Sequence, residues 1–480
     1  MKQIIYILFL LFASMPSMAA DYNVRDFGAK GDGTTLDSHA INDAISAAVT
    51  KGGGRVVLPT GTYLSGTIRM KSNIELHLEA GAILLATEDK LAYDKSEPFN
   101  FPEYQDGGHT YFHNSLIWAE GGQNISITGP GMIDGSGLTK KDTERAGSVQ
   151  GGSIGTGDKA IALKQCSNVI IRDLTIFRGG HFAIIVTGCE CGNIDNVTID
   201  TNRDGIDIDC CKFFTVSNCK VNTPNDDAIV LKSSYALKRA VTTEHILINN
   251  CLVTGYKLGT FLDGTRVPEQ VNWVCGRIKL GTESNGGYRN IAISNCTFMY
   301  SSGIALEEVD QGRMENIIVT NLSMSHVHHY PIYITTGCRN RGPKEIISPS
   351  YGGDIMVSNV IAQDCDSLAG IIVTGMPDEP LQNISLSNIR ISYRGGGTVD
   401  LRDRDYREQS TNYPEPRWAG PTPAYGLFAR HVNGLSVSDV KFTTEKPDYR
   451  HCIILDNVKG DDIRHVTGPV EQSAQFLVRR

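Results

Sequence analysis

The sequence predicts an all-β protein, a single right-handed parallel β-helix in which the chain winds as a solenoid behind a short N-terminal capping helix. The first observation is a motif in which alternating apolar residues precede Ser or Asn and then Asn or Asp. Copies begin at Val169, Val216, Ile246, Ile291, Ile317, Ile355, Ile384 and Leu435. The second is their spacing, since positions 173, 196, 218 and 250 lie 23, 22 and 32 residues apart. A coil of three short strands and three turns needs about that many residues.

Strands and corners follow from the residues of the motif. Its apolar residues alternate with a period of two, which is the period of a β-strand, whereas helical repeats need a spacing of 3.6. Leucine-rich repeats are also disfavoured, because the motif has no ladder of leucines. Val, Ile and Thr favour strands, and Gly and Asn tolerate the positive φ angles of tight corners.

One helix is predicted, over residues 37–49. Its apolar side chains fall on one face: Ala40, Ile41, Ala44, Ile45 and Ala48. We expect this helix to cap the N-terminal end of the solenoid, where the first strands would otherwise expose an unpaired edge.

Residues 1–20 are predicted to be a secretory signal peptide. Lys2 supplies the positive start, residues 4–13 the apolar run, and residues 17–20 the small-residue exit. A membrane anchor is the alternative, but the apolar run is shorter than the ~20 residues that span a bilayer. We therefore expect a secreted or periplasmic protein without membrane contact after cleavage. Residues 21–480 are expected to form one β-helix domain.

The net charge limits the expected binding partners, and the positions of the cysteines bear on whether disulfides form. The net charge of −8 at pH 7 argues against nucleic acid or an anionic membrane, but local basic residues would still allow an acidic glycan to bind. Disulfides are one interpretation of twelve cysteines in an exported protein. The preferred interpretation is stacking as buried thiols, because Cys219, Cys251 and Cys296 recur at one place in successive repeats.

No metal or other cofactor is predicted. The cysteine spacings of zinc sites are absent. The run of His326, His328 and His329 is the one cluster that resembles a metal site. Alternate strand residues face opposite sides, so at most His326 and His328 would share an ion, and the remaining ligands are missing.

Three carboxylates concentrate the chemistry of the chain. Asp204 lies in the segment 201–207, and Asp226 and Asp227 follow about one coil later. Residues one coil apart are separated by one strand spacing, about 4.8 Å, so these side chains should share a face and mutual repulsion should raise at least one pKa. Inverting hydrolysis of a glycosidic bond needs such a pairing of protonated acid and ionised base. The alternative is ordinary turn chemistry, since Arg-Asp-Gly and Asn-Asp-Asp are common turn sequences.

Three segments of the chain resemble glycoside hydrolase family 28, the polygalacturonase family. They are the opening segment 23–33, Asn202-Arg203-Asp204, and Asp226-Asp227 after Asn225. The resemblance extends over most of the mature chain and implies a pectin lyase-like β-helix that hydrolyses galacturonide bonds of pectin with inversion, as in plant cell wall degradation. It also implies that Asp226 is the general acid, and that Asp204 and Asp227 bind and deprotonate the attacking water.

The family's Gly-His-Gly element is not matched. Two registers are possible, at residues 255–260 or 276–282, and neither contains a histidine. The second is preferred because a repeat strand follows it directly. It makes residues 256–275 part of an insertion and puts Arg277 where the family has histidine.

The family's Arg-Ile-Lys element, which binds a galacturonate carboxylate, is not matched either. Its place, one coil further on, is held by Glu307 and Glu308. Rhamnogalacturonan-type or otherwise substituted pectic oligosaccharides therefore fit better than plain homogalacturonan. Arg277 and Lys279, together with Lys257, are expected to restore positive charge nearby, and Glu307 or Glu308 would bind hydroxyls.

Further candidates lie at the edges of the predicted cleft. His181, in the turn before the first aspartate, is expected either to bind substrate or to pack the turn. Arg339 and Arg341 are loop residues that would reach an anionic sugar, or remain solvated. Residues 402–423 are rich in proline and charge and predict a long surface insertion that closes one end of a groove, which favours attack on chain ends.

Three functions remain open. The preferred one is an inverting, exo-acting hydrolase of pectic polysaccharides or oligosaccharides. A polysaccharide lyase on the same fold would use the three aspartates to bind calcium and Arg277 to abstract a proton. A non-catalytic glycan-binding solenoid would use the aspartates only as turn residues.

Overall fold

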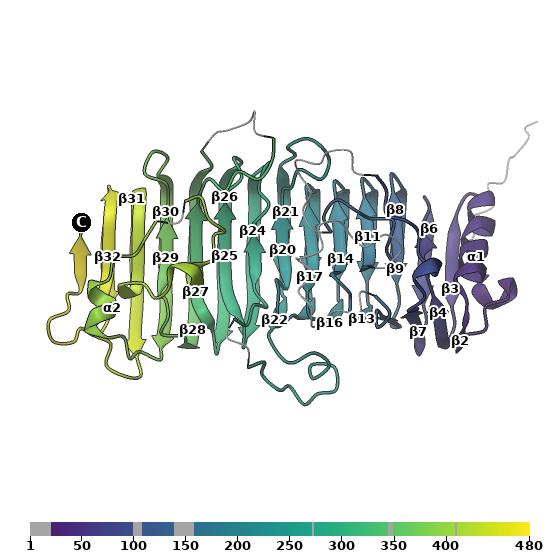
Figure 1. Ribbon diagram of the computed structural model, residues 1–480, viewed down its shortest axis with the longest axis horizontal. Helices are drawn as coiled ribbons and strands as arrows, with labels where there is room; N and C mark the ends of the chain where they lie inside the picture. The colour runs from purple at the N-terminus through teal and green to yellow at the C-terminus, as the bar shows by residue number, and fades with distance from the viewer. Residues whose placement is uncertain (1–20, 99–107, 139–157, 271–272, 344–348, 409) are drawn as a thin grey trace, which may run out of the picture.

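The computed structural model describes residues 21–98, 108–138, 158–270, 273–343, 349–408 and 410–480. Its 34 strands wind into one right-handed parallel β-helix, which confirms the predicted fold (Figure 1). The predicted signal peptide lies outside the described residues. Within the described part of the chain, no helix is both long and apolar enough to cross a membrane.

The coils build three parallel sheets. The first, called the site sheet below, stacks β5 (Ile68–Arg69), β8 (Ile117–Glu120), β11 (Lys159–Lys164), β14 (Phe182–Thr187), β17 (Asp204–Asp209), β20 (Ile229–Lys232), β23 (Ile278–Leu280), β25 (Ser302–Glu308), β27 (His328–Thr336), β29 (Ile371–Thr374), the first part of β31 (Ala424–Thr444), β32 (His451–Lys459) and β34 (Leu477–Arg479). The second stacks β1 (Asp21–Asn23), β3 (Gly54–Leu58), β6 (Ile74–Leu78), β9 (Gln123–Thr128), β12 (Ser167–Arg172), β15 (Glu190–Asp195), β18 (Lys212–Ser217), β21 (Thr243–Asn249), the first parts of β24 (Tyr288–Met299), β26 (Arg313–Ser325), β28 (Tyr351–Cys365) and β30 (Leu381–Tyr393), and β33 (Asp462–Thr467). The third stacks β2 (Asp32–Leu36), β4 (Gly61–Ser65), β7 (Ala82–Ala86), β10 (Met132–Asp134), β13 (Thr175–Phe177), β16 (Thr198–Asp200), β19 (Lys220–Asn222) and β22 (Leu252–Thr254), and continues in the second parts of the long strands.

The corner between the second and third sheets is made by the Asn or Asp that ends each copy of the repeat motif. In the long strands this residue is Asn295, Asn321, Asn359 or Asn388, and each has a positive φ, between 50° and 57°. The amides of Asn321, Asn359 and Asn388 also donate to the same corner of the preceding coil, at 3.0 Å from Asn321 to Asn295 and 2.7 Å from Asn388 to Asn359. Asn suits this position because its short polar side chain tolerates the left-handed region.

The interior of the solenoid is a set of stacked apolar side chains. In the site sheet Ile184, Ile206, Ile229, Ile278 and Ile304 lie in register on successive strands, and all are buried. All twelve cysteines are free, and nine of them are buried thiols: Cys166, Cys189, Cys210, Cys211, Cys219, Cys251, Cys296, Cys365 and Cys452. The predicted stacking of thiols on successive coils is therefore confirmed, whereas disulfides do not form.

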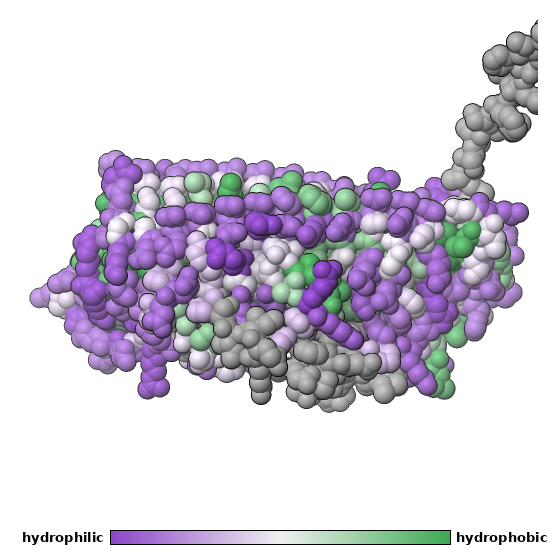
Figure 2. All heavy atoms as spheres, turned by 90° about the horizontal axis from the view of Figure 1, so that it is seen from above, coloured by the Kyte–Doolittle hydropathy of each residue, from purple (hydrophilic) through white to green (hydrophobic). Residues whose placement is uncertain are grey.

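Helices are few and lie outside the coils. The predicted capping helix is confirmed as α1 (Ser38–Thr50), whose buried face contains Ala40, Ile41, Ala44, Ile45 and Ala48 and packs on β3 at one end of the rod. Short helical turns occur at η1 (Val24–Phe27), η2 (Lys90–Ala92), α2 (Val399–Asp403) and α3 (Pro416–Ala419). Hydrophilic side chains cover most of the face seen in Figure 2, with short apolar patches between them.

Candidate active site

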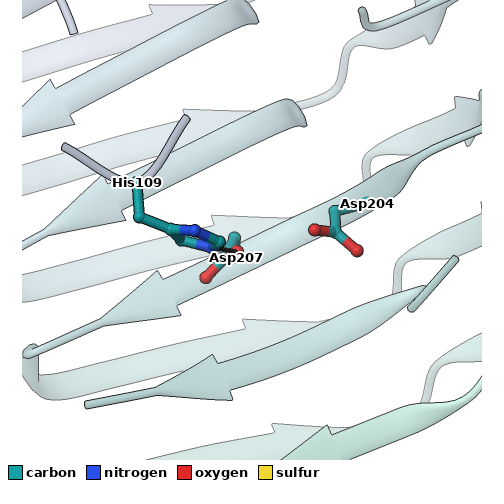
Figure 3. Close-up of side chains that lie close together, drawn as sticks. All are labelled: His109, Asp204 and Asp207. Atoms are coloured by element: carbon teal, nitrogen blue, oxygen red, sulfur yellow. Dashed lines mark hydrogen bonds and ion pairs between the residues drawn. The ribbon is translucent and has the colours of Figure 1, made fainter. Parts of the chain in front are cut away.

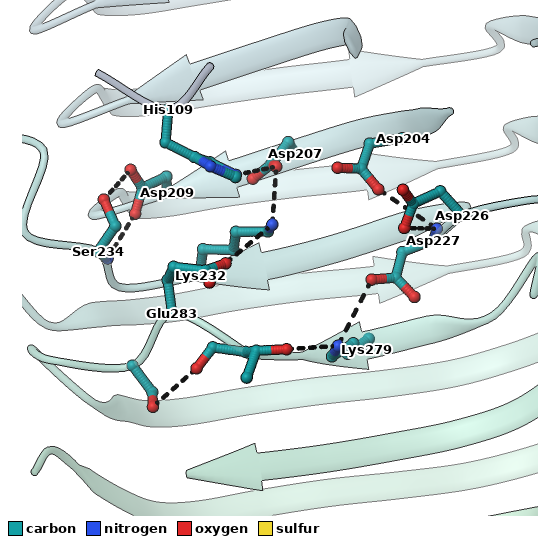
Figure 4. A network of polar contacts seen from close by, with 12 residues as sticks. His109, Asp204, Asp207, Asp209, Asp226, Asp227, Lys232, Ser234, Lys279 and Glu283 are labelled. Carbon is teal, nitrogen blue, oxygen red and sulfur yellow. Dashed lines mark hydrogen bonds and ion pairs between the residues drawn. The ribbon is translucent and has the colours of Figure 1, made fainter. Parts of the chain in front are cut away.

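The three predicted aspartates meet on the outer face of the site sheet (Figure 4). Asp204 begins β17, and Asp226 and Asp227 lie in the turn before β20, whose Ile229 pairs with Ile206 of β17. The backbone amide of Asp227 lies 3.3 Å from a carboxylate oxygen of Asp204 and 3.1 Å from one of Asp226. The one-coil spacing thus brings the carboxylates together as predicted. Asp204 and Asp227 are buried, and Asp226 is the more exposed member, with 23% of its side chain accessible.

The protonation states of two of the aspartates are driven apart by their surroundings. Burial and the neighbouring Asp226 carboxylate raise the pKa of Asp204 well above its usual value. Burial also acts to raise the pKa of Asp227, but the charges of Arg277 and Lys279 outweigh it and hold that pKa low. The surroundings therefore favour the protonated form of Asp204 and the ionised form of Asp227. Repulsion from Asp226 contributes to the raised pKa of Asp204, as predicted, but burial is the larger cause.

Arg277 is the main partner of Asp227. Its Nε donates to Asp227 at 2.6 Å, its Nη2 donates to Glu415 at 2.6 Å, and its Nη1 contacts the Tyr330 hydroxyl and lies 3.4 Å from Glu415. Only 5% of the Arg277 side chain is accessible. The residue thus holds the ionised carboxylate in place, and all three of its guanidinium nitrogens are already engaged.

Lys279 and Glu307 form the next layer of the site. The Lys279 ammonium lies 3.2 Å from Glu307, 3.7 Å from Asp227 and 2.8 Å from the Thr282 hydroxyl, and it is buried. Burial raises the pKa of Glu307 to about 7, against the opposing charge of Lys279. The pair therefore carries a positive charge when Glu307 is protonated and none when it is ionised.

The sheet register supports the preferred alignment of the family's basic elements. Ile278 pairs with Ile229 of β20 and with Ile304 of β25, so Arg277 follows the aspartate coil and Glu307 lies one coil beyond it. The residues between β22 and β23 form the predicted insertion. Lys257, in this insertion, is exposed, and no described contact brings its side chain to the aspartates.

Two other predicted binding residues take different places. Glu308 is buried and accepts from the backbone amides of Asp310 and Gly312, so it braces a turn rather than facing the aspartates. The prediction that Glu308 binds hydroxyls at the site is therefore not supported by its contacts, because its carboxylate faces its own turn. His181 does lie at the site, with its Nε2 3.3 Å from Arg203, and burial followed by the charge of Arg203 lowers its pKa.

The loop arginines are already paired with acidic side chains. Arg339 is buried against Asp310, lies 3.3 Å from Glu283, and stacks over the Tyr413 ring. Arg341 is about half exposed and lies 3.6 Å from Glu283. Arg339 therefore braces the site and does not offer a free cation to a sugar.

Several site residues were not predicted from the sequence. Arg203 directly precedes Asp204 in the sequence, and its guanidinium is 3.0 Å from Asp226. Tyr413 and Glu415 come from the insertion 402–423 and reach Thr282 and Arg277. The proline-rich composition of the insertion predicted that it closes a groove, but nothing local showed which of its side chains would enter the site.

His109 is a further unpredicted residue, and it reaches the sheet from the segment before β8. Its side chain points toward Asp207 of β17 (Figure 3), and its Nε2 lies 3.3 Å from that carboxylate. Its ring packs edge-on against Phe182. One ligand atom each of His109, Asp204 and Asp207 lies within 4.8 Å of the others, which would suit a cation. However, Lys232 lies 3.6 Å from Asp207 and already brings a positive charge to this cluster, so the geometry gives no support to a resident metal.

Comparison with known proteins agrees with this geometry. The family model described as "Rhamnogalacturonase A/epimerase, pectate lyase-like" matches residues 22–256. The protein named "Probable polygalacturonase" of Vitis vinifera is 23% identical over 401 residues, which cover 80% of this chain and 76% of that protein. The "Exo-poly-alpha-D-galacturonosidase" of Dickeya chrysanthemi is 23% identical over 454 residues, which cover 80% of this chain and 69% of that protein.

A solved structure supports the same fold. The hyperthermoactive exopolygalacturonase of Thermotoga maritima superposes with a TM-score of 0.63 at 23% identity, covering 78% of this chain and 87% of that one. The sequence relatives, the shared β-helix and the aspartates at one-coil spacing all support the same assignment: the chain is similar to the polygalacturonases, a family of the glycoside hydrolase family 28 type.

Proposed function

We propose that the protein is an exo-acting glycosidase that hydrolyses galacturonide-containing pectic chains with inversion at the anomeric carbon. The observation that carries the proposal is the contact of Asp204, Asp226 and Asp227 on neighbouring coils, where burial raises the pKa of Asp204 while Arg277 and Lys279 hold the pKa of Asp227 low. Two carboxyl groups in opposite protonation states are what acid–base hydrolysis of a glycosidic bond requires. The named activities of the sequence relatives support the pectic substrate.

The roles follow from position and protonation. Asp226, the most exposed of the three aspartates, is the general acid, which gives a proton to the leaving oxygen and so neutralises the departing alkoxide. Asp227, held by Arg277, removes a proton from the attacking water as the water oxygen bonds to the anomeric carbon. The proton gained by Asp227 balances the one lost from Asp226, and exchange with water restores the resting state.

Inversion is supported by the family resemblance rather than by the spacing of the carboxylates. The closest oxygens of Asp226 and Asp227 lie within 4.8 Å. Most inverting glycosidases separate the two carboxyl groups by roughly 6.5–9.5 Å. Stereochemistry is therefore the part of the proposal that most needs a direct measurement.

The proposed substrate and mode of attack rest on separate observations. A rhamnogalacturonan-type chain agrees with the description of the matching family model and with the acidic residue at position 307. Attack on chain ends agrees with the two segments that reach the site from outside the coils, one through His109 and one through Glu415. Export follows from the character of residues 1–20.

A lyase mechanism is less well supported. It would need Arg277 to act as the base, but the charge of Asp227 outweighs burial and raises the pKa of Arg277 well above its usual value. An arginine held between two carboxylates remains protonated and cannot accept a proton.

The experiment is a product assay on a panel of pectic oligosaccharides, with proton NMR of the new anomeric centre. We expect the wild type to release an inverted reducing sugar and Asp226→Asn to lose this activity. Asp173→Asn is the matched control, because Asp173 occupies a repeat corner away from the site. An unsaturated product would indicate a lyase, and binding without turnover by the wild type would indicate a glycan-binding solenoid.

A further inference from the structure

Glu415 occupies the position in which a bound uronate carboxylate would be expected. Its two oxygens face Nη1 and Nη2 of Arg277, at 3.4 and 2.6 Å. This two-pronged approach is the arrangement by which arginine binds a planar carboxylate from a ligand. Arg277 lies directly beside the catalytic Asp227, so the occupied position borders the reacting bond.

The local backbone holds Glu415 in this position. Pro414 and Pro416 flank it, and its own backbone is extended, with φ −104° and ψ 117°. A residue before proline is biased towards this conformation, and α3 begins immediately afterwards at Pro416. Only 11% of the Glu415 side chain is accessible. The carboxylate is therefore a built part of the site rather than a mobile surface group.

Tyr413 of the same insertion also lies beside the second cation, Lys279. The Thr282 hydroxyl donates to the Tyr413 hydroxyl at 2.8 Å, and the Tyr413 ring lies 5.6 Å from the Lys279 ammonium. Lys279 is already shared among Thr282, Glu307 and Asp227. Both cations that were expected to grip a galacturonate thus have protein partners, and an added anion would meet Glu415 and Glu307 as well.

We propose that Glu415 is a specificity-determining residue: it excludes a uronate from the sugar position over Arg277 and leaves that position to a neutral sugar. The inference rests on the proposed hydrolase function and names one of the two sugars at the bond that is cleaved. A pectic backbone in which acidic and neutral sugars alternate meets this requirement, whereas a chain of galacturonate alone does not.

The test compares oligogalacturonides with the same oligomers in fully methyl-esterified form. The measured quantity is the ratio of kcat/KM on the acidic form to kcat/KM on the esterified form, in which effects on the shared chemistry cancel. We expect the wild type to favour the esterified form and Glu415→Gln to raise the ratio by about 10–100-fold, the value of a charge-assisted hydrogen bond. Glu408→Gln is the matched control on the same insertion, because Glu408 pairs with His431 instead. It should leave the ratio unchanged.

A binding measurement separates this inference from the proposed function. Calorimetry with trigalacturonate in the Asp226→Asn background should show tighter binding when Glu415→Gln is added, and adding Arg277→Met should remove the gain. Equal thermal unfolding midpoints would show that the variants remain folded. An unchanged ratio together with unchanged trigalacturonate affinity would overturn the role of Glu415, whereas a wild type that turns over no member of the pectic panel would overturn the hydrolase proposal.

Discussion

Two kinds of segment build the site, and they contribute different things. Asp204, Asp227 and Lys279 come from the stacked coils, where the sheet register fixes each side chain one strand spacing from the next. His109 and Glu415 come from segments that cross the outer face from distant parts of the chain. In the proposed function the coils carry the reacting groups, and the crossing segments are proposed to select the sugars that reach them.

The most direct test of this difference is to substitute one residue from a coil and one from a crossing segment. Asp227→Asn should lower kcat by roughly 10²–10⁴-fold, because the base is lost while the fold of the coil is kept. His109→Phe should lower kcat by less than about tenfold, since His109 contacts Asp207 and not the reacting pair. Steady-state kinetics on the best substrate of the panel measure both. An equally large loss of kcat in the His109 variant would show that the crossing segments take part in the chemistry.

A second test uses the pH dependence of stability. The folded-state pKa of Asp204 is raised, so this carboxyl adds stability below its ordinary pKa of 3.8, and that stability is lost as the pH rises through the raised value. Asp204→Asn should therefore stabilise the protein at pH 8 by about 1–3 kcal/mol, the cost of an unsatisfied buried group, and by much less at pH 4. Thermal unfolding at the two pH values measures this difference. The same gain at both pH values would show that burial of the charge is not its cause.

The smallest effect is expected at a corner far from the site. Asn359 has a φ of 55° and continues the ladder of corner amides. Asn359→Ala should cost about 1 kcal/mol more than Asn359→Gly, because only alanine is strained in the left-handed region, while both variants lose the amide contacts. Thermal unfolding measures the difference, and neither variant should change kcat. Equal losses would assign the corner's contribution to the amide ladder alone.

The fold was predictable because its information is local and repeated. The motif that ends at Asn295, Asn321 and Asn359 predicts a strand, a corner and a row of inward-facing side chains. Because the motif recurs, the same prediction holds for each coil that contains it. The period of two also fixed which residues face inward, and the one-coil spacing placed Asp204 beside Asp226 and Asp227.

The rest of the site was not predictable for the opposite reason. Glu415 contacts Arg277 across 138 residues, and His109 contacts Asp207 across 98, without any repeat that relates the partners. The expectation that Arg277 and Lys279 restore positive charge near the aspartates did not include these partners, because a sequence pattern does not show which distant acid will pair with a buried cation. Of the two glutamates predicted as alternatives for binding hydroxyls, only Glu307 faces the site, because adjacent strand residues face opposite sides.

The buried free thiols of the solenoid can be used to detect local opening of its coils. The amide of Cys166 lies 3.3 Å from the Cys189 sulfur, and the amide of Cys189 lies 3.4 Å from the Cys211 sulfur, so these cysteines mark consecutive coils. Burial raises the pKa of Cys189 well above that of a free thiol, so an alkylating reagent finds almost no thiolate while the coils stay closed. The labelling rate of each of these cysteines would therefore measure how often its coil opens. The order of labelling would show which of these coils unfolds first.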